Sequence, residues 1–305
     1  MRFTLKQLEY FVAAGEALSI KQASERINIS QPSISSAIAH LESDLGVQLF
    51  VRHHARGLSL TPAGRRLLAE AKSLLLQAAT IYEVANETSS EVRGQLALGC
   101  FVTLAPMIMP ELVHSFQSEY PGVRLQPEEG DHAELVARLQ RAELDIVLTY
   151  DLPVPDGISF EALVALPPHV LVAADHRLAG RSSIGLQDLE GDPLILLDLP
   201  QSREYFLSIF HQEGVAPKIH ARSRQQDVVR TMVANGHGFT LANVRPRNLT
   251  ALDGRPLRQI PLDGDHRPMR IGIASLIQER KTRLLQTFET HCRALISDGA
   301  VPGMD

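Results

Sequence analysis

Residues 30–46, SQPSISSAIAHLESDLG, decide the fold of the N-terminal part of this chain. Ser30 is a good helix N-cap, and Pro32 falls in the first turn, where a backbone N–H has no intrahelical partner. Apolar residues then recur at steps of four, three and four residues, which predicts one buried face of an α-helix: Ile34, Ile38, Leu41 and Leu45. The opposite face is polar, as on most surface helices, so its meaning depends on its neighbours.

A short segment before this helix makes the pattern more specific. Residues 20–27 predict a helix capped by Ser19, and only Asn28 and Ile29 separate it from Ser30. Two short helices joined in this way are typical of a helix-turn-helix, whose second helix enters the DNA major groove by its N-terminal end. Residues 5–18 predict a further amphipathic helix before them, with two acidic residues inside its apolar pattern, which is unlike a signal peptide.

Residues 47–64, VQLFVRHHARGLSLTPAG, predict a β-hairpin, or wing, after the helix-turn-helix. Its tip carries Arg52, His54 and Arg56, and basic wing tips commonly contact DNA phosphates. A merely solvated loop is the alternative. The charge distribution favours binding of nucleic acid by the N-terminal part. Residues 1–66 contain eight Lys and Arg against five acids, a net charge of +3. Because the whole chain has a net charge of −5, the remainder carries −8.

Thr61 and Pro62 begin a long predicted helix that runs to about Ser89, with the threonine as cap and the proline at the first helical position. Apolar residues along it alternate steps of four and three: Leu67, Ala71, Leu74, Ala78, Ile81 and Ala85. A seam sustained over this length usually pairs with another helix, so we expect a dimerising linker. A core helix of a globular domain is the alternative.

From residue 93 the pattern changes to alternating strands and helices, which predicts an α/β domain with mostly parallel strands. A ligand cleft is then expected at the C-terminal ends of the strands. The predicted strands are 95–99, 123–129, 144–150, 169–174, 193–198, 218–223, 239–243 and 269–275. The predicted helices are 103–120, 131–142, 202–213, 225–235 and 277–296, with a Pro-rich crossing after residue 150.

Several function classes lack support in the sequence. No apolar run approaches the roughly 20 residues that span a bilayer, and a cytoplasmic protein without membrane contact is the simplest expectation. Cys100 and Cys292 give neither a disulfide framework nor metal-ligand spacing, so no cofactor is expected. An enzyme is one rival, but there is no GxSxG and no phosphate-binding glycine loop. An architectural DNA-binding protein without a ligand is another rival, but DNA packaging does not need the large domain of residues 93–305.

Over its whole length the sequence resembles the LysR-type transcriptional regulators. The N-terminal match, LKQLEYFVAAGEALSIKQASERINISQPSISSAIAHLESDLGVQLFVRHHARGLSLTPAG, is highly specific. Looser matches follow in the expected order: LDIVL at 144, VLVAADHRLAG at 170, DLEGDPLILLD at 188 and NGHGFTLANVRP at 235. The resemblance implies an α/β multidomain protein: a winged helix-turn-helix (1–60), a dimerising linker helix (61–92) and a two-lobed, periplasmic-binding-protein-like effector domain (93–305). Lobe I would comprise about 93–165 and 269–305, and lobe II about 166–268.

The resemblance also implies the partners and the DNA contacts. The partners are promoter DNA, a small-molecule effector of unknown identity, further copies of the chain in a dimer and then a tetramer, and RNA polymerase. Carried over by position, the DNA-binding residues are Gln31, Pro32, Ser33, Ser35, Ser36, His40, Arg52, His54 and Arg56. Ser36 departs from the family, which often has arginine there, and a short side chain cannot contact guanine in bidentate fashion. His40, the wing or DNA shape would then read the inner bases.

Effector contacts in the family lie at strand ends that face the cleft. The corresponding residues here are Cys100, Phe101, Val102, Thr103, Asp131, Gln201, Ser202, Arg203, Phe239 and Thr240. Thr103 and Ser202 could equally be helix caps, and Asp131 with Glu134 makes a plausible capping pair. Cys100 invites the alternative of a redox-responsive regulator, although a lone cysteine at an apolar strand end is usually a small buried hydrophobe.

Two helix N-termini, hydroxyl groups and the Arg203 cation together favour an anionic effector. The expectation is a small carboxylate or amino acid that alters promoter binding from between the two lobes. An Asp131 side chain that faced the cleft could hold an amine, and Phe101 and Phe239 would contact the apolar part.

Overall fold

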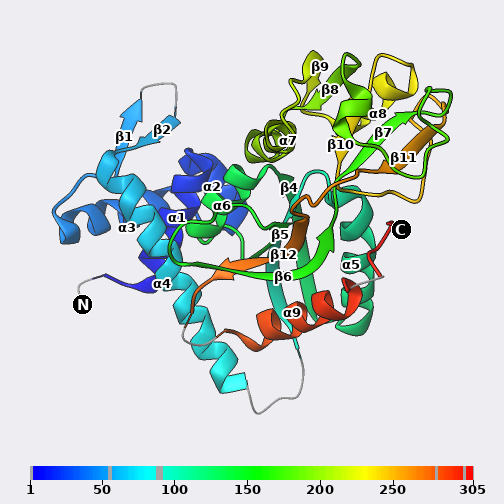
Figure 1. Ribbon diagram of the computed structural model, residues 1–305. Helices are drawn as coiled ribbons and strands as arrows, with labels where there is room; N and C mark the ends of the chain where they lie inside the picture. The colour runs from blue at the N-terminus through cyan, green and yellow to red at the C-terminus, as the bar shows by residue number, and fades with distance from the viewer. Residues whose placement is uncertain (1–2, 54–56, 87–91, 279–280, 298–299, 305) are drawn as a thin grey trace. The chain divides into compact units, whose positions relative to one another are not determined.

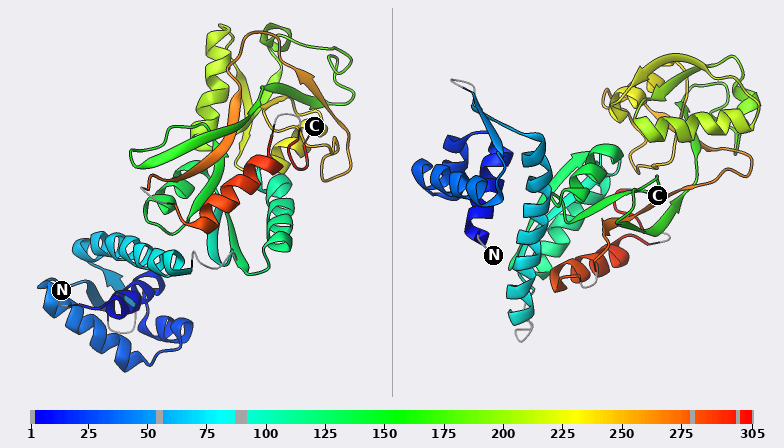
Figure 2. Two further views of the ribbon diagram at one scale, coloured as in Figure 1. Left: turned by 90° about the horizontal axis from the view of Figure 1, so that it is seen from below. Right: turned by 90° about the vertical axis from the view of Figure 1, so that its left-hand side faces the viewer.

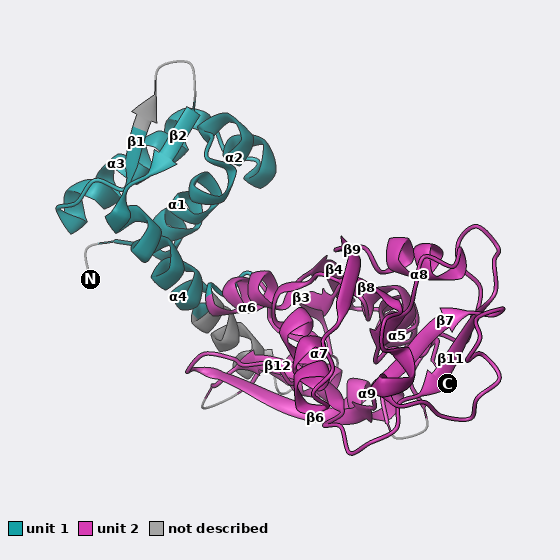
Figure 3. Ribbon diagram, turned by 45° about the horizontal axis from the view of Figure 1, so that its top comes forward, with its two compact units in different colours: residues 1–90, 141–143 teal, residues 91–140, 144–305 magenta. Residues whose placement is uncertain are grey.

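The computed structural model describes residues 3–53, 57–86, 92–278, 281–297 and 300–304. The chain divides into two compact units, residues 1–90 with 141–143 and residues 91–140 with 144–305 (Figure 3). The first unit contains the predicted helix-turn-helix and the second the predicted α/β region.

The first unit confirms the three predicted N-terminal helices: α1 (Leu5–Ala17), α2 (Ile20–Ile27) and α3 (Gln31–Leu45). Ser30 caps α3 as expected, since its hydroxyl accepts a hydrogen bond from the Ser33 N–H at 3.3 Å. The apolar face of α3 is buried against α1, where Phe11 is 1% exposed and packs edge-on against Phe50 with ring centroids 5.6 Å apart. Burial of this face therefore fixes which side of α3 remains in solvent.

The predicted wing is an antiparallel hairpin of β1 (Phe50–His53) and β2 (Gly57–Leu60). Its tip, residues 54–56, lies outside the described residues. The Glu42 carboxylate of α3 accepts hydrogen bonds from the Leu49 and Phe50 N–H groups at 2.7 and 3.2 Å. This carboxylate joins α3 to the base of the wing, so the two predicted DNA-contacting elements are held together.

The long helix α4 (Pro62–Asn86) begins as predicted, because the Thr61 hydroxyl accepts from the Gly64 N–H at 2.9 Å. Part of the predicted seam faces elsewhere: Leu67 and Ala71 pack against the core of the helix-turn-helix. The apolar stripe of α4 is wide enough for residues along one edge of it to pack against the core of the same chain. Leu74 is 37% exposed and does not belong to that core.

The second unit contains a five-stranded sheet in the order β4-β3-β5-β12-β6 (Figure 1). Its strands are β3 (Gly94–Phe101), β4 (Val123–Gly130), β5 (Ile146–Tyr150), β6 (Ile158–Leu166) and β12 (Met269–Leu276). Helices α5 (Ala105–Glu119) and α9 (Arg283–Leu295) pack together on one face, and α6 (His132–Gln140) lies on the other (Figure 2). β3, β4 and β5 are parallel, so their C-terminal ends share one edge.

A second set of strands forms two smaller sheets, β10-β7-β11 and β8-β9. They comprise β7 (His169–Ala173), β8 (Pro193–Leu197), β9 (Lys218–Ser223), β10 (Thr240–Ala242) and β11 (Leu257–Pro261). Helices α7 (Pro200–Gln212) and α8 (Gln226–Ala234) cover them, and a short 3₁₀ helix spans Leu186–Leu189. The hydrophobic cores of these strands are distinct from that of the five-stranded sheet.

The prediction of mostly parallel strands is wrong. β12 pairs antiparallel with β5 and β6, and β7 pairs antiparallel with β10 and β11. Two of these strands were not predicted: β6 follows the Pro-rich crossing, and β11 lies in a stretch with mixed polarity. The closing helix begins at Arg283 rather than at residue 277, because Thr282 is its cap and accepts from the Leu285 N–H at 3.1 Å.

Candidate DNA-binding surface and effector pocket

The N-terminal end of α3 presents a polar, solvent-exposed surface. Its exposed residues are Gln31, Pro32, Ser33, Ser36 and His40, and Ser35 is half-buried. Ile34 and Ile38, which alternate with them, are buried in the core of the unit, so the polar side cannot turn inward. The Ser33 hydroxyl lies 2.8 Å from that of Ser30, so these two side chains interact with each other. Gln31 is the longest polar side chain in the first turn and is free to extend into solvent.

The predicted DNA contacts of the wing fall mainly on residues outside the described part of the chain. Arg52 lies on β1 opposite Leu58, but its side chain is not described. His54 and Arg56 lie outside the described residues. The predicted phosphate contacts of the wing therefore remain a prediction.

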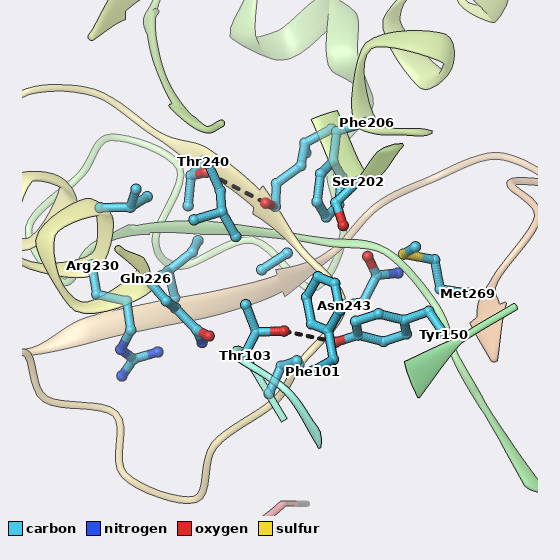
Figure 4. Close-up of a pocket in the computed structure, with 16 residues that line it drawn as sticks. Phe101, Thr103, Tyr150, Ser202, Phe206, Gln226, Arg230, Thr240, Asn243 and Met269 are labelled. Atoms are coloured by element: carbon cyan, nitrogen blue, oxygen red, sulfur yellow. Dashed lines mark hydrogen bonds between the residues drawn. The ribbon is translucent and has the colours of Figure 1, made fainter. Parts of the chain in front are cut away.

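A pocket of about 550 Å³, counting the part open to solvent, lies in the second unit (Figure 4). The C-terminal ends of β3, β5 and β8 reach it through Phe101, Tyr150 and Leu197, as expected of a cleft at strand ends. Apolar side chains make up most of its wall, and its polar members are Thr103, Ser202, Gln226, Arg230, Thr240 and Asn243.

Two hydroxyl groups in the pocket do not cap helices. Helix α5 begins after Leu104 without a side-chain cap, and the Thr103 hydroxyl instead lies 3.2 Å from the Tyr150 hydroxyl. Ser202 is the third residue of α7, whose N-cap Leu199 also makes no side-chain cap bond. Both serve the pocket wall, and each is only 5% exposed.

The cation in this pocket is Arg230 of α8, which is 7% exposed. One guanidinium nitrogen donates to the carbonyls of Asn248 and Thr250 at 2.8 and 3.3 Å. Burial lowers the pKa of Arg230, and the nearby Asp227 opposes that shift. No carboxylate of the described residues forms an ion pair with this guanidinium within 4 Å, so its charge is compensated only by the two carbonyls and, at longer range, by Asp227.

The structure brings four of the ten predicted effector residues to this pocket: Phe101, Thr103, Ser202 and Thr240. Asp131 and Gln201 line a smaller neighbouring cavity with Phe101 and Ser202. The remaining four line neither cavity: Cys100, Val102, Arg203 and Phe239. Phe239 belongs to the core of the smaller sheets, because its side chain points to the opposite side of the chain from that of Thr240.

Arg203, the cation expected in the cleft, does not line this pocket. Its guanidinium donates to the Asp198 carboxylate at 2.8 Å, and that interaction lowers the pKa of Asp198. Asp131 likewise has partners for both oxygens: it caps α6 by accepting from the Glu134 N–H at 3.0 Å, and it accepts from Arg224 at 2.9 Å. Asp131 therefore caps α6 as one of the two interpretations predicted, and an amine bound at Asp131 would have to displace Arg224.

Cys100 is fully buried in the core of the five-stranded sheet. Burial, with smaller contributions from Glu129 and Cys292, raises the pKa of its thiol. The thiolate is the reactive form of cysteine, so this environment disfavours oxidation by peroxide.

Sequence reasoning missed the most informative pocket residues: Tyr150, Phe206, Gln226, Arg230, Asn243 and Met269. Tyr150 could have been found, because it ends a predicted buried strand next to Phe101 and Thr103. Arg230 gives no local signal, since an arginine on a surface helix is ordinarily exposed.

The described part of the chain shows neither a membrane-spanning helix nor a metal cluster. None of its helices has the length and apolarity required to cross a lipid bilayer. Its histidine, cysteine and carboxylate side chains form no group of three or more suited to a metal ion.

Comparison with known proteins agrees with both parts of this description. The family of bacterial regulatory helix-turn-helix proteins of the lysR type matches residues 5–65, and the LysR substrate binding domain matches residues 89–297. The structure of HinK, a LysR family transcriptional regulator from Pseudomonas aeruginosa, is 36% identical, covers 98% of this chain and 100% of that chain, and superposes with a TM-score of 0.67.

Two further relatives carry names that refer to peroxide or OxyR. A full-length OxyR variant from Pseudomonas aeruginosa is 25% identical, covers 95% of this chain and 98% of that chain, and has a TM-score of 0.78. A probable hydrogen peroxide-inducible genes activator from Streptomyces viridosporus is 35% identical over 78% of this chain and 77% of its own length. Together with the helix-turn-helix and the pocketed α/β unit, these matches identify the chain as a DNA-binding transcriptional regulator of the LysR family, and not an enzyme.

Proposed function

We propose that this protein controls transcription by binding promoter DNA in the cytoplasm and that a small molecule bound in the pocket modulates this binding. The observation that carries the proposal is the pairing, in one chain, of an exposed polar α3 end with a partly open pocket whose wall includes a buried cation. Residues 1–60 would bind DNA, 61–92 would form the linker and 93–305 would hold the effector. The two lobes of residues 93–305 would meet at the pocket.

The assembly is part of the same proposal. A dimer through α4, and a tetramer of two such dimers, would place several α3 helices on neighbouring half-sites and leave other surfaces for RNA polymerase. The exposure of Leu74 on α4 supports the dimer, because an exposed leucine on a helix with a heptad-like pattern is suited to a partner helix.

The effector class follows from the pocket wall. A mainly apolar lining with one buried arginine suits a small organic molecule with a negative group, which keeps a carboxylate or an amino acid as the proposed class. Arg230 takes the role first given to Arg203.

A pair of substitutions tests the DNA interface. Arg52→Ala is expected to weaken binding to all DNA sequences and to lower the salt dependence by about one unit, because one phosphate contact would be lost. Gln31→Ala is expected to lose discrimination at particular base pairs, by about 1–3 kcal/mol for each, and to keep the salt dependence. Binding titrations at several salt concentrations, on specific and scrambled duplexes, separate the two.

An unchanged salt slope for Arg52→Ala would remove the wing from the phosphate interface. Equal losses on specific and scrambled duplexes for Gln31→Ala would show that the start of α3 does not read bases.

A redox-responsive regulator that uses Cys100 is the second candidate, favoured by the names of the peroxide-related relatives. Its thiol environment opposes this role. We expect Cys100 in the native protein to react with a disulfide reagent at least about 100-fold more slowly than a free thiol, since the raised pKa and the burial act together. Stopped-flow absorbance measures this rate.

A Cys100→Ser variant provides the functional check. Its promoter binding should respond to peroxide no differently from that of the wild-type protein. A peroxide response that disappears in this variant, but persists in Cys292→Ser, would restore the redox function.

A further inference from the structure

The pocket has two polar ends with different hydrogen-bonding character. In the view of Figure 4, the Arg230 guanidinium lies at one end with the Gln226 amide beside it, and Ser202 and Asn243 lie toward the other. Gln226 and Arg230 are one turn apart on α8, whereas Asn243 contacts α7 through the Tyr205 hydroxyl at 3.4 Å. Apolar side chains that include Leu171, Phe206 and Val229 make up the rest of the wall.

The α8 end has more positive charge than its surroundings balance. Burial, with the charges of Arg245 and Arg230, lowers the pKa of His169 to about 3 against an opposing interaction with the Pro167 backbone, and this keeps the ring neutral. The Arg245 Nε and the Gln259 Nε2 are buried and have no hydrogen-bond partner in the described structure, although neither residue lines the pocket itself. Gln259 pairs with Leu171 across β7 and β11, and Leu171 is two residues along β7 from His169, so the side chains of His169, Leu171 and Gln259 share one side of the sheet.

Gln226 and Arg230 thus give this end of the pocket several N–H donors, and no carboxylate lines it, although Asp227 acts on Arg230 from outside the lining. A buried guanidinium without a carboxylate is costly, and an anion placed against it would recover much of that free energy. The first turn of α8 adds little to the attraction, because Asp227 lies in it and offsets the partial positive charge of the N–H groups there.

The opposite end offers an acceptor. The Asn243 amide nitrogen donates to the Leu166 carbonyl at 2.8 Å, which orients the amide so that the Oδ1 atom is the free group. That Oδ1 is buried without a hydrogen-bond partner, and Asn243 is only 4% exposed. A ligand that donates a hydrogen bond here would satisfy it, and the Ser202 hydroxyl lies on the same side of the pocket.

The choice of donor follows from the missing negative charge. Aspartate and glutamate are absent from the residues that line the pocket in the described part of the chain. An ammonium group would therefore lose its hydration without gaining a counterion, whereas a hydroxyl would need only the acceptor.

We propose that the effector is a small hydroxy-substituted organic acid, whose carboxylate binds at Arg230 and whose hydroxyl donates to Asn243 across an apolar middle. This inference rests on the proposed function and narrows its ligand class from carboxylates and amino acids to hydroxy acids. The carboxylate would complete the ion pair that Arg230 lacks, and the apolar middle would pack among Leu171, Phe206 and Val229.

A matched set of probes tests this assignment on the full chain by isothermal titration calorimetry. The aromatic set is 4-hydroxyphenylacetate, phenylacetate, 4-hydroxyphenylacetamide and tyramine, and 5-hydroxypentanoate with pentanoate form an aliphatic pair. We expect the hydroxy acid of at least one scaffold to bind at least about tenfold more tightly than the matched acid without the hydroxyl. We also expect 4-hydroxyphenylacetate to bind at least about tenfold more tightly than the corresponding amide and amine.

Variants then assign the two ends. Arg230→Gln should reduce the preference for acid over amide to about one, and Arg230→Lys should restore part of it. Asn243→Leu, with Ser202→Ala as a milder alternative, should reduce the preference for the hydroxyl and leave the acid preference in place. Arg203→Gln is the control, because that guanidinium pairs with Asp198 outside the pocket.

Three results would overturn the inference: tighter binding of tyramine than of its acid, acid binding that Arg230→Gln leaves unchanged, or no binding of either hydroxy acid at millimolar concentration. Operator binding measured on the same samples separates this failure from a wider one. Wild-type protein that binds its operator but no hydroxy acid would refute only the ligand class, whereas failure to bind promoter DNA would refute the proposed function.

Discussion

Leu74→Glu is expected to dissociate the dimer and to raise its dissociation constant by at least about 100-fold. Leu74 is 37% exposed in the single chain, so the proposed α4 pairing would bury it against its equivalent in a second copy. The substitution removes two leucine contacts, worth about 2 kcal/mol each, and places two unpaired carboxylates at the interface. Sedimentation velocity over a range of protein concentrations measures the shift.

Promoter binding should fall with it. A dimer that holds two α3 helices on one operator benefits from an effective concentration that a monomer lacks, so operator affinity should drop by about 100-fold or more. The exposure of Leu74 makes the test clean, because a glutamate there meets solvent in the monomer and should leave its melting temperature nearly unchanged.

Glu70→Gln is the matched control, since Glu70 is exposed on the same helix one turn earlier. It should leave both the oligomer and operator binding intact. An undiminished oligomer in Leu74→Glu would show that α4 does not pair through this residue.

The DNA-binding unit could be predicted almost completely from the sequence because its signals are local. Ser19, Ser30 and Thr61 each cap the helix that follows, as their positions indicated. The apolar steps through Ile34 and Ile38 fixed the buried face of α3, and the polar face followed by exclusion. The division of the α4 stripe could not be foreseen, because sequence spacing does not say whether Leu67 meets its own core or another chain.

The effector pocket could be predicted only at strand ends. Phe101 and Thr103 follow β3 directly, so a rule about strand termini locates them. Arg230 and Asn243 come from α8 and from the residue after β10, and only the packing of the smaller sheets brings them to Phe101. Both side chains are buried, whereas a charged or amide side chain is ordinarily expected to be exposed. The sequence therefore favoured Arg203, which lies at the start of a predicted helix, as the cleft cation.

The antiparallel pairing of the strands was missed for a similar reason. β12 pairs with β5 and β6, which lie more than 100 residues earlier in the sequence, and such pairings leave no mark on local periodicity. β6 also has a mixed burial pattern with exposed residues near its centre, so it lacks the apolar run typical of a buried strand.

Gly64→Ala is expected to destabilise the DNA-binding unit by about 2 kcal/mol or more, although helix propensity alone predicts the opposite sign. Gly64 lies in the first turn of α4, where its N–H donates to the Thr61 hydroxyl. An added Cβ would stand 2.1 Å from the Leu49 carbonyl oxygen, a backbone atom that cannot rotate away. That oxygen also accepts from the Thr61 N–H at 3.0 Å, so any shift would weaken the joint between α4 and the wing.

Hydrogen exchange of α1 and α3 amides in the full chain measures this loss within the unit concerned, and operator affinity should fall with it. Gly180→Ala is the control: Gly180 is exposed, and an added Cβ there meets nothing within 4 Å. A stability change near zero, or slightly favourable, is expected for that variant because alanine restricts the unfolded chain. Protection of α1 and α3 that is equal in the two variants would mean that the base of the wing can yield, and that a contact with a backbone oxygen does not explain the glycine at position 64.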